Sequence, residues 1–480
     1  MQLQLPKRIA NPGLAALIQG GGFRSLERFA MAVNACGWEV FGLKLFYDHV
    51  TVKRWLAGSV CQNPQAVAEA LSRAWGVPIP VQVAWPELRE GQGPAPAYLQ
   101  AWVPTRTLDD LGAFIGADML SRREALAASI SAATGATLVD PLTRWLNVAP
   151  GGLRAPADAT RRIGMDEVES TEAATRHFAA LDARTGGGLS REAAVGQLKY
   201  AVDLARHASY DETVGNRLLV AIAGLAGLAG WMSHDSGMGG PAQKYLLYGL
   251  QAARESTDDR APLLVVRLLE DIGQQLRWAG KYDTAVRLFD LALGQLPPGR
   301  NRFSLTRALI TSSKAQALSY LGSVCLPEVR SSAALSEDLQ ADASDEEREV
   351  LAGIAHRSSV DKAGPDLAAK AAEAYMVLAR EDKRLASEAE ARALQALANV
   401  GEGHGRLRAL AQIRLSRVRF VGGEPDQACE DGEEALEVAG TVNSAMIRAR
   451  LRELLSDTEA YGGRPRVREL QERLRTTLRP

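Results

Sequence analysis

The side chains most suited to catalysis stand together at residues 231–236, where the sequence is WMSHDS. Serine, histidine and aspartate form the triad of many hydrolases, but in those enzymes the nucleophile, the base and the orienting acid converge from separate elements. Adjacent residues on one helix point in different directions, so this string does not assemble such a triad. We therefore predict that the protein is not an enzyme.

Patterns that would bind phosphate or metal are also weak. Residues 185–190 (TGGGLS) could hold a phosphate at a helix N-terminus, but they lack the lysine of a Walker loop and a preceding strand. A turn capped by Ser190 fits them better. The six histidines have no metal-ligand spacing, and the four cysteines form no Cys-x-x-Cys pair. These patterns predict no metal, no cofactor and no disulfide framework, as in a reducing cytoplasm.

Side chains that could contact nucleic acid gather near the N-terminus. The whole chain has a net charge of -1, whereas residues 1–85 hold eight basic and four acidic side chains. The apolar spacing predicts four short helices in this segment, over residues 13–19, 25–34, 51–57 and 64–75. Ser25 has the residue type of an N-cap, and Gly58 that of a helix stop.

The third of these helices has a pattern suited to DNA recognition. Its apolar positions are spaced i, i+3, i+4 and share one buried face, made of Val52, Trp55 and Leu56. Its polar positions point outward, and they are Thr51, Lys53 and Arg54. In a recognition helix, cationic groups bind phosphates and side chains at base edges specify the sequence. The same periodicity is typical of a solvated face on a small helical bundle.

The wider arrangement of residues 11–77 resembles the XRE, or lambda-repressor-like, helix-turn-helix family. The matching positions are Leu26, Phe29, Ala30, the string TVKRW at 51–55, Gly58, Pro64, residues 67–71, Gly76 and Val77. The resemblance implies that residues 51–55 enter the major groove and that helix 25–34 lies across them. The DNA contacts would come from Arg24, Ser25, Arg28, Thr51, Lys53 and Arg54. Fifteen residues separate Asn34 from Val50, where the family usually has a tight turn, so either the turn is enlarged or the domain is degenerate.

The rest of the chain predicts helices. Residues 86–160 contain two breaks rich in proline and glycine around a helical pattern, which indicates a linker and a helical connector. Residues 161–480 form a succession of amphipathic helices with almost no strand signal, so we expect an all-α protein. The acidic stretch 336–349 predicts a loop. The most apolar run, residues 218–232, is shorter than the roughly 20 residues of a membrane span and predicts a buried helix. With no signal segment, we expect a cytoplasmic protein without membrane association.

The clearest internal unit runs over residues 280–293 (GKYDTAVRLFDLAL), with Gly273 before it and Pro297 after it. Small residues at 273, 285 and 292 allow two helices to approach closely, Tyr282 and Phe289 fill the space between them, and Pro297 stops the second helix. This pattern resembles the tetratricopeptide repeat (TPR). One repeat cannot bury its own core, so several must stack into a TPR-like α-solenoid. Glycines at 237, 280, 322 and 364, separated by 43, 42 and 42 residues, suggest the register of its turns, and Gly423 falls outside that register.

Residues 163–248 resemble a large group of actinobacterial regulators that join an XRE-type domain to TPRs. The matching positions include Val168, Glu169, Thr175, Phe178, Asp182, residues 186–188, 229–232, Asp235, Gly237 and Tyr245. Some of these proteins are similar to regulators of differentiation and secondary metabolism, and distant relatives are controlled by small peptides. The resemblance implies a helix-turn-helix domain over residues 1–85, a connector over 86–160 and a TPR-like domain over 161–480.

The repeat register also predicts a groove. With Gly280 as the turn, the side chains on the concave face would be Trp231, His234, Asp235, Arg267, Glu270, Gln274, Arg277 and Trp278. Such a groove could hold an extended peptide through hydrogen bonds and charge pairing. A water-filled groove without a ligand, or a surface for self-association, fits the same residues.

We therefore predict a cytoplasmic, sequence-specific regulator of transcription that binds double-stranded DNA. We expect a homodimer formed through the repeat domain, with half-sites about 34 to 36 Å apart or a multiple of that distance. A peptide, a small-molecule effector or a protein partner would bind the repeats. The alternative is a TPR interaction scaffold whose degenerate helix-turn-helix does not bind DNA.

Overall fold

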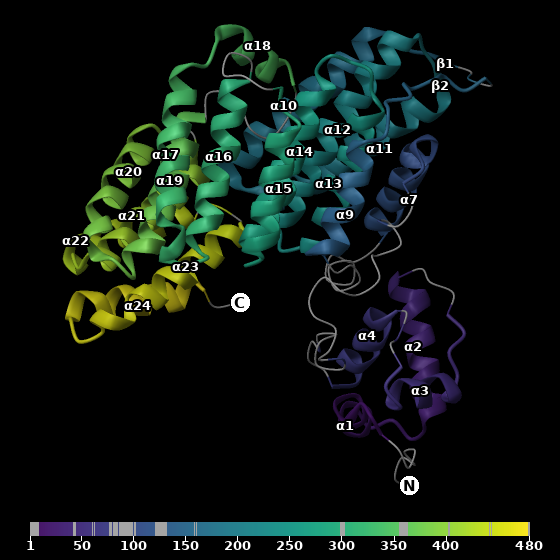
Figure 1. Ribbon diagram of the computed structural model, residues 1–480, viewed down its shortest axis with the longest axis horizontal. Helices are drawn as coiled ribbons and strands as arrows, with labels where there is room; N and C mark the ends of the chain where they lie inside the picture. The colour runs from purple at the N-terminus through teal and green to yellow at the C-terminus, as the bar shows by residue number, and fades with distance from the viewer. Residues whose placement is uncertain are drawn as a thin grey trace. The chain divides into compact units, whose positions relative to one another are not determined.

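The computed structural model describes residues 9–41, 45–59, 61, 63–75, 79, 85, 99, 102–120, 132–157, 159, 161–297, 303–354, 363–401, 404–440, 442 and 444–478. The chain divides into two compact units, Met1–Ala101 with Leu120–Leu142, and Trp102–Met119 with Thr143–Pro480. Both units are built from helices (Figure 1). Within the described residues, the strands are one short parallel pair, β1 (Arg161–Arg162) with β2 (Ala208–Ser209). The predicted all-α class is confirmed.

The first unit begins with four helices, α1 (Pro12–Gly20), α2 (Leu26–Phe41), α3 (His49–Leu56) and α4 (Pro64–Trp75). A side chain caps each of the first three, because Asn11, Ser25 and Asp48 accept hydrogen bonds from backbone N–H groups three residues ahead. After α3, Gly58 takes a positive φ of 99° and ends the helix as predicted. The apolar faces of the four helices enclose one core that includes Phe29, Trp55 and Leu71.

The chain continues through η1 (Pro104–Arg106), α7 (Thr107–Leu120) and α9 (Ala136–Leu146), and the second unit then builds a long helical array. Two helices open it, α10 (Met165–Thr185) and α11 (Arg191–His207). Five helical pairs follow, α12 (Glu212–Asp235) with α13 (Gly239–Glu255), α14 (Ala261–Trp278) with α15 (Tyr282–Gly294), α16 (Ser304–Ser319) with α17 (Leu326–Ala341), α19 (Ala363–Ala379) with α20 (Ala386–Ala398), and α21 (Gly405–Gly422) with α22 (Pro425–Ala439). The array ends with α23 (Ala445–Asp457) and α24 (Pro465–Thr477).

The first helices of successive pairs form an inner layer. Helix α12 contacts α14, α14 contacts α16, and the series continues through α19 and α21 to α23. The layer also closes on itself, because α10 contacts α21 and α12 contacts α23. Buried ion pairs join the two ends of the array, including Arg406 with Asp182 at 2.8 Å. The polar side chains of the inner layer therefore face one another inside the array.

The predicted unit around residue 280 is one of these pairs. A Cβ atom at Gly273 would lie 2.5 Å from the Phe289 ring, so α14 and α15 approach too closely there for any side chain. Gly280 has a positive φ of 74° and makes the turn between the two helices. Helix α15 ends at Gly294, three residues before Pro297, so the proline follows the helix end and does not itself stop the helix.

The predicted register of turns is correct for three positions and then fails. Gly237, Gly280 and Gly322 all have positive φ at the turns of their pairs. Gly364, the predicted fourth turn, lies inside α19, and the turn of that pair is at Asp382. The register shifts because a further helix, α18 (Asp345–Gly353), is inserted between α17 and α19. Gly423, with a φ of 99°, then makes the next turn.

The acidic stretch 336–349 is mostly helical, so the predicted loop is wrong except at residues 342–344, which connect two helices. It covers the end of α17 and the start of α18. The carboxylate of Glu347 accepts the backbone N–H groups of Leu305 and Thr306 at 2.9 Å each. An acidic side chain at this position satisfies the free amides at the start of α16 and suits the positive end of its dipole.

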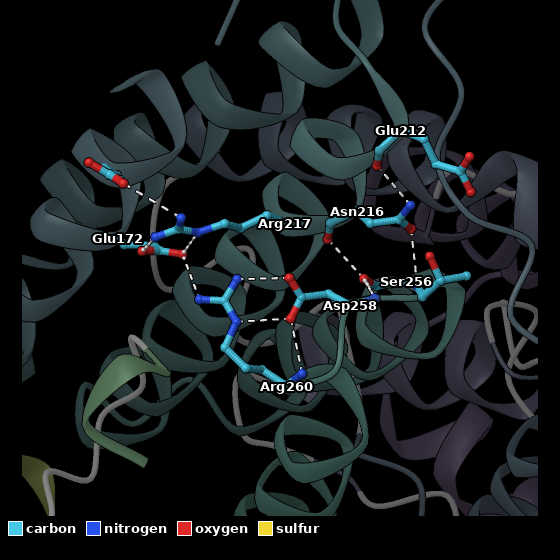
Figure 2. A network of polar contacts seen from close by, with 9 residues as sticks. Glu172, Glu212, Asn216, Arg217, Ser256, Asp258 and Arg260 are labelled. Carbon is cyan, nitrogen blue, oxygen red and sulfur yellow. Dashed lines mark hydrogen bonds and ion pairs between the residues drawn. The ribbon is translucent and has the colours of Figure 1, made fainter. Parts of the chain in front are cut away.

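A polar network fixes the turn between α13 and α14 to the start of the array (Figure 2). Glu172 of α10 binds Arg217 of α12 through two hydrogen bonds of 3.1 and 3.0 Å, and it also pairs with Arg260 at 3.3 Å. Arg260 in turn forms a two-point contact with Asp258, with both distances 2.8 Å. The Asn216 side chain accepts the N–H of residue 257 at 2.9 Å. These contacts lock α10, α12 and the α13–α14 turn into one register.

Judged by length and composition alone, helix α12 is long and apolar enough to cross a membrane. It is the one such helix in the described part of the chain. In its most apolar window, 89% of the residues are buried inside the second unit. The prediction of a buried helix in this run is confirmed.

Candidate functional site

Helix α3 has the two faces that its spacing predicts. Val52 and Leu56 are fully buried and Trp55 is 3% exposed, so one side of the helix is part of the core of the first unit. Lys53 and Arg54 lie on the exposed side. Among the described residues, no ion pair engages either cation. Both positive charges are therefore available to a polyanion.

The other predicted DNA contacts fall into two groups. Arg24 and Arg28 are exposed at the start of α2, and α2 packs against α3. The polar hydroxyls have local partners instead: Ser25 Oγ accepts the Arg28 N–H at 3.1 Å, and the Thr51 hydroxyl donates to Asp48 Oδ1 at 2.7 Å. The structure thus assigns Ser25 and Thr51 to helix capping and leaves the cations as the outward groups.

The long connection between α2 and α3 is held at its base. Helix α2 runs to Phe41 and not only to Asn34, so part of the enlarged turn is helical. The Asn34 side chain then binds the backbone of Tyr47 twice, donating to its carbonyl at 2.8 Å and accepting its N–H at 2.9 Å. This pair of hydrogen bonds brings the start of α3 back to α2 although twelve residues lie between. The spacing of residues along the chain gave no sign of this bridge, because Tyr47 lies in the stretch without a family counterpart.

Aromatic contacts support α3 from the same side. The Tyr47 ring meets the Trp55 ring edge-on at 4.9 Å, and its hydroxyl accepts the Asn63 side-chain N–H at 2.7 Å. Cys61 lies in the same core, where burial raises the pKa of its thiol to about 12. That cysteine is protonated at neutral pH and is a packing residue, not a nucleophile.

The side chains predicted to line a groove in the repeats lie on the inner layer but are mostly buried. Trp231, Asp235, Arg267, Glu270, Gln274 and Arg277 are each at most 5% exposed, and His234 and Trp278 are half-buried. They bind one another and neighbouring helices: Arg267 pairs with Glu270 at 2.6 Å, and Lys370 of α19 pairs with Glu270 at 3.0 Å. The array fills this face with its own ion pairs, so in this conformation it is not an open groove.

The string 231–236 lies at the end of α12, and its side chains bind residues of different elements. Ser233 Oγ donates to the Ala229 carbonyl at 2.7 Å and accepts Arg191 Nε at 2.8 Å. Asp235 accepts the Gly187 N–H at 3.1 Å and binds Ser444, the N-cap of α23. The serine and the aspartate thus join separate helices, and Asp235 links α12 to α23.

A charged cluster in the inner layer is centred on Glu373 of α19, a residue to which no sequence pattern pointed. Its Oε1 atom receives hydrogen bonds from Arg277 at 3.1 Å, Arg450 at 2.7 Å and the Tyr320 hydroxyl at 2.7 Å. Arg414 lies 3.8 Å from Oε2. Burial alone would raise the pKa of this carboxyl, but the neighbouring guanidinium charges outweigh burial and hold the pKa well below its ordinary value. Glu373 is therefore ionised and neutralises part of a cationic cluster.

A second buried carboxylate, Glu255, ends α13. It accepts the Thr107 hydroxyl of α7, and Thr107 in turn accepts the Trp102 indole N–H at 2.8 Å. Burial raises the pKa of Glu255 to about 7, and these hydrogen bonds offset only part of that effect.

No group of three or more His, Cys, Asp or Glu side chains in the described ranges is arranged to hold a metal ion.

The comparison with family models matches residues 14–84 to a family described as the SP15 N-terminal domain. This segment covers α2, α3, α4 and most of α1. The chain matches none of the curated proteins compared with it.

Proposed function

We propose that this protein is a sequence-specific DNA-binding regulator of transcription in which α2 and α3 act as a helix-turn-helix. The observation that carries the proposal is helix α3, which buries Val52, Trp55 and Leu56 and exposes Lys53 and Arg54 without an acidic partner among the described residues. A rigid helix with a cationic outer face suits the major groove, where phosphate contacts position the protein and base-edge contacts specify the sequence.

The helical array supports a TPR-like assignment for the rest of the chain. Its paired helices, its turn glycines and the close approach at Gly273 agree with the repeat pattern. In the proposed protein the array forms the homodimer that places two α3 helices on two half-sites, and it responds to a peptide, small-molecule or protein effector. Ion pairs close the inner face of the array. An effector therefore acts there only if it binds an arrangement of the helices with this face open more tightly than it binds the closed arrangement.

The test is a binding experiment with the full chain. Duplexes that bind are selected from a random library, and affinity for the recovered sequence is measured by gel shift at increasing salt. We expect Lys53→Ala/Arg54→Ala to weaken binding and to lower the salt slope by about 2, since two phosphate contacts are removed. The control Arg287→Ala/Arg330→Ala removes two exposed charges from α15 and α17 and should bind as the wild type does.

The alternative is a TPR scaffold that does not bind DNA, and the long connection between α2 and α3 is the observation that favours it. The DNA-binding proposal would be contradicted if the wild-type chain enriched no duplex. It would also be contradicted if the wild type and the Lys53→Ala/Arg54→Ala variant bound DNA equally well. The next measurement would then be identification of protein partners of the repeat domain.

A further inference from the structure

The N-terminal end of α3 presents apolar side chains to the outside. Phe46, two residues before the Asp48 cap, is 81% exposed, and Val50 in the first turn is 42% exposed. Val50 precedes Lys53 and Arg54 by three and four positions, so these side chains share one face of the helix. Exposed apolar side chains beside a cationic face suit a partner that offers both charge and apolar groups, as the major groove of DNA does.

Phe46 lies on a backbone that is held in place. The next residue, Tyr47, is fixed through both of its backbone polar groups by Asn34 and through its ring by Trp55. A side chain on a fixed backbone loses less conformational entropy when it binds than one on a free loop. Phe46 is thus presented in advance at the tip of α3.

The charge at this end of α3 disfavours phosphate. Asp48 caps the helix, and hydrogen bonds from Thr51 lower the pKa of its carboxyl, so it is ionised at neutral pH. An acid at a helix N-terminus occupies the amides that would otherwise bind an anion. The cations follow only in the next turn, at Lys53 and Arg54. The N-terminal end therefore fits an uncharged, apolar feature of DNA better than its backbone.

We propose that Phe46 and Val50 contact the C5-methyl groups of thymine bases in the major groove. The thymine methyl is the apolar feature that the groove edge of a base pair offers, and apolar side chains are its usual partners. In this arrangement Lys53 and Arg54 bind phosphates, and the apolar tip selects thymine at the neighbouring positions of each half-site. The inference rests on the proposed DNA-binding function and names the base that α3 recognises.

The experiment uses the duplex recovered by selection, with each thymine replaced singly by deoxyuridine, which removes only the methyl group. We expect one or two positions per half-site at which the replacement weakens binding about fourfold, as burial of one methyl group predicts. Val50→Ala and Phe46→Ala should bind the thymine duplex more weakly and lose the difference between the thymine and deoxyuridine duplexes. Both residues are exposed, so the variants are expected to fold.

The matched control is Met31→Ala, which truncates another exposed apolar side chain, 58% exposed, on α2. It should keep the full thymine preference. Two results would overturn the inference while leaving DNA binding itself intact. The first is a duplex that binds equally well with deoxyuridine at every position. The second is a thymine preference that persists in both Phe46→Ala and Val50→Ala. Failure to select any duplex would overturn the proposed function as well, so the two failures are distinguishable.

Discussion

Removal of the Glu373 carboxylate should destabilise the second unit strongly. This side chain is 2% exposed and is the shared acceptor of Arg277, Arg450 and Tyr320. In Glu373→Ala, several buried guanidinium groups lose their counter-ion at once. Taking one partner out of a buried ion pair typically costs about 3 to 5 kcal/mol, because the remaining charge stays in a poorly solvated place.

The partners that remain set the size of the effect. Arg277 keeps a hydrogen bond to Gln274 at 2.8 Å, and Arg450 keeps Glu453 at 2.5 Å. Arg450 also stays 4.0 Å from the centre of the Trp278 ring. We therefore expect a loss of about 3 kcal/mol for Glu373→Ala, at the lower end of that range. Glu373→Gln keeps a neutral acceptor and should cost about half as much, since charge-assisted hydrogen bonds are roughly twice as strong as neutral ones.

The pH dependence follows from the lowered pKa of Glu373. A carboxyl with a depressed pKa in the folded state stabilises the protein fully above its ordinary value of 4.5, and this contribution is lost as the pH falls toward the folded-state pKa. The stability difference between wild type and Glu373→Ala should accordingly be constant above about pH 5 and shrink at lower pH.

The assay is urea unfolding followed by far-UV circular dichroism, with hydrogen exchange of the peptides from α19 assigning the transition to the second unit. The control is Arg414→Met, because the contact of Arg414 with Glu373 is long, at 3.8 Å, and burial lowers its pKa. Its replacement should change stability by less than about 1 kcal/mol. A loss below about 1 kcal/mol in Glu373→Ala, or an equal loss in Arg414→Met, would refute the assignment of Glu373 as the centre of the cluster.

Three further predictions test other contacts, one of them with a matched control. Glu255→Gln should stabilise the protein above about pH 7 by at most about 3 kcal/mol and flatten the fall in stability between about pH 4.5 and 7. The reason is that a carboxyl group with a raised pKa costs stability as the pH rises. Melting temperatures measured against pH test this prediction, and an unchanged slope would contradict it. Gly273→Ala should lower the free energy of unfolding in urea by about 1 to 3 kcal/mol, because the added methyl group clashes with a ring of α15. The control Gly196→Ala, in open space on α11, should raise the free energy of unfolding by about 0.5 to 1 kcal/mol. Equal effects of the two substitutions would argue against the clash. Asn34→Ala should cost about 1 to 2 kcal/mol and speed hydrogen exchange at Tyr47, and unchanged exchange there would show that the bridge is not needed.

The local patterns of the sequence determined the class of the fold and the faces of single helices. The i, i+3, i+4 spacing in α3 was enough to predict which side is buried, because 3.6 residues per turn place those side chains on one stripe in any environment. The same holds for the pair α14–α15, where the small residue at 273 and the ring at 289 specify one close contact between adjacent helices. Each of these features depends on residues fewer than twenty positions apart.

The tertiary structure decided which helices meet across the array. Arg277 and Arg450 reach Glu373 from 96 and 77 residues away, and Arg406 reaches Asp182 from 224 residues away. Two features that no local period encodes create these contacts: the inserted α18, which shifts the register of the later turns, and the closure of α10 and α12 onto α21 and α23. Periodicity specifies that a polar side chain lies on the inner layer, but its partner depends on how the whole array curves. That is why the inner face was expected as an open groove and is instead closed by ion pairs.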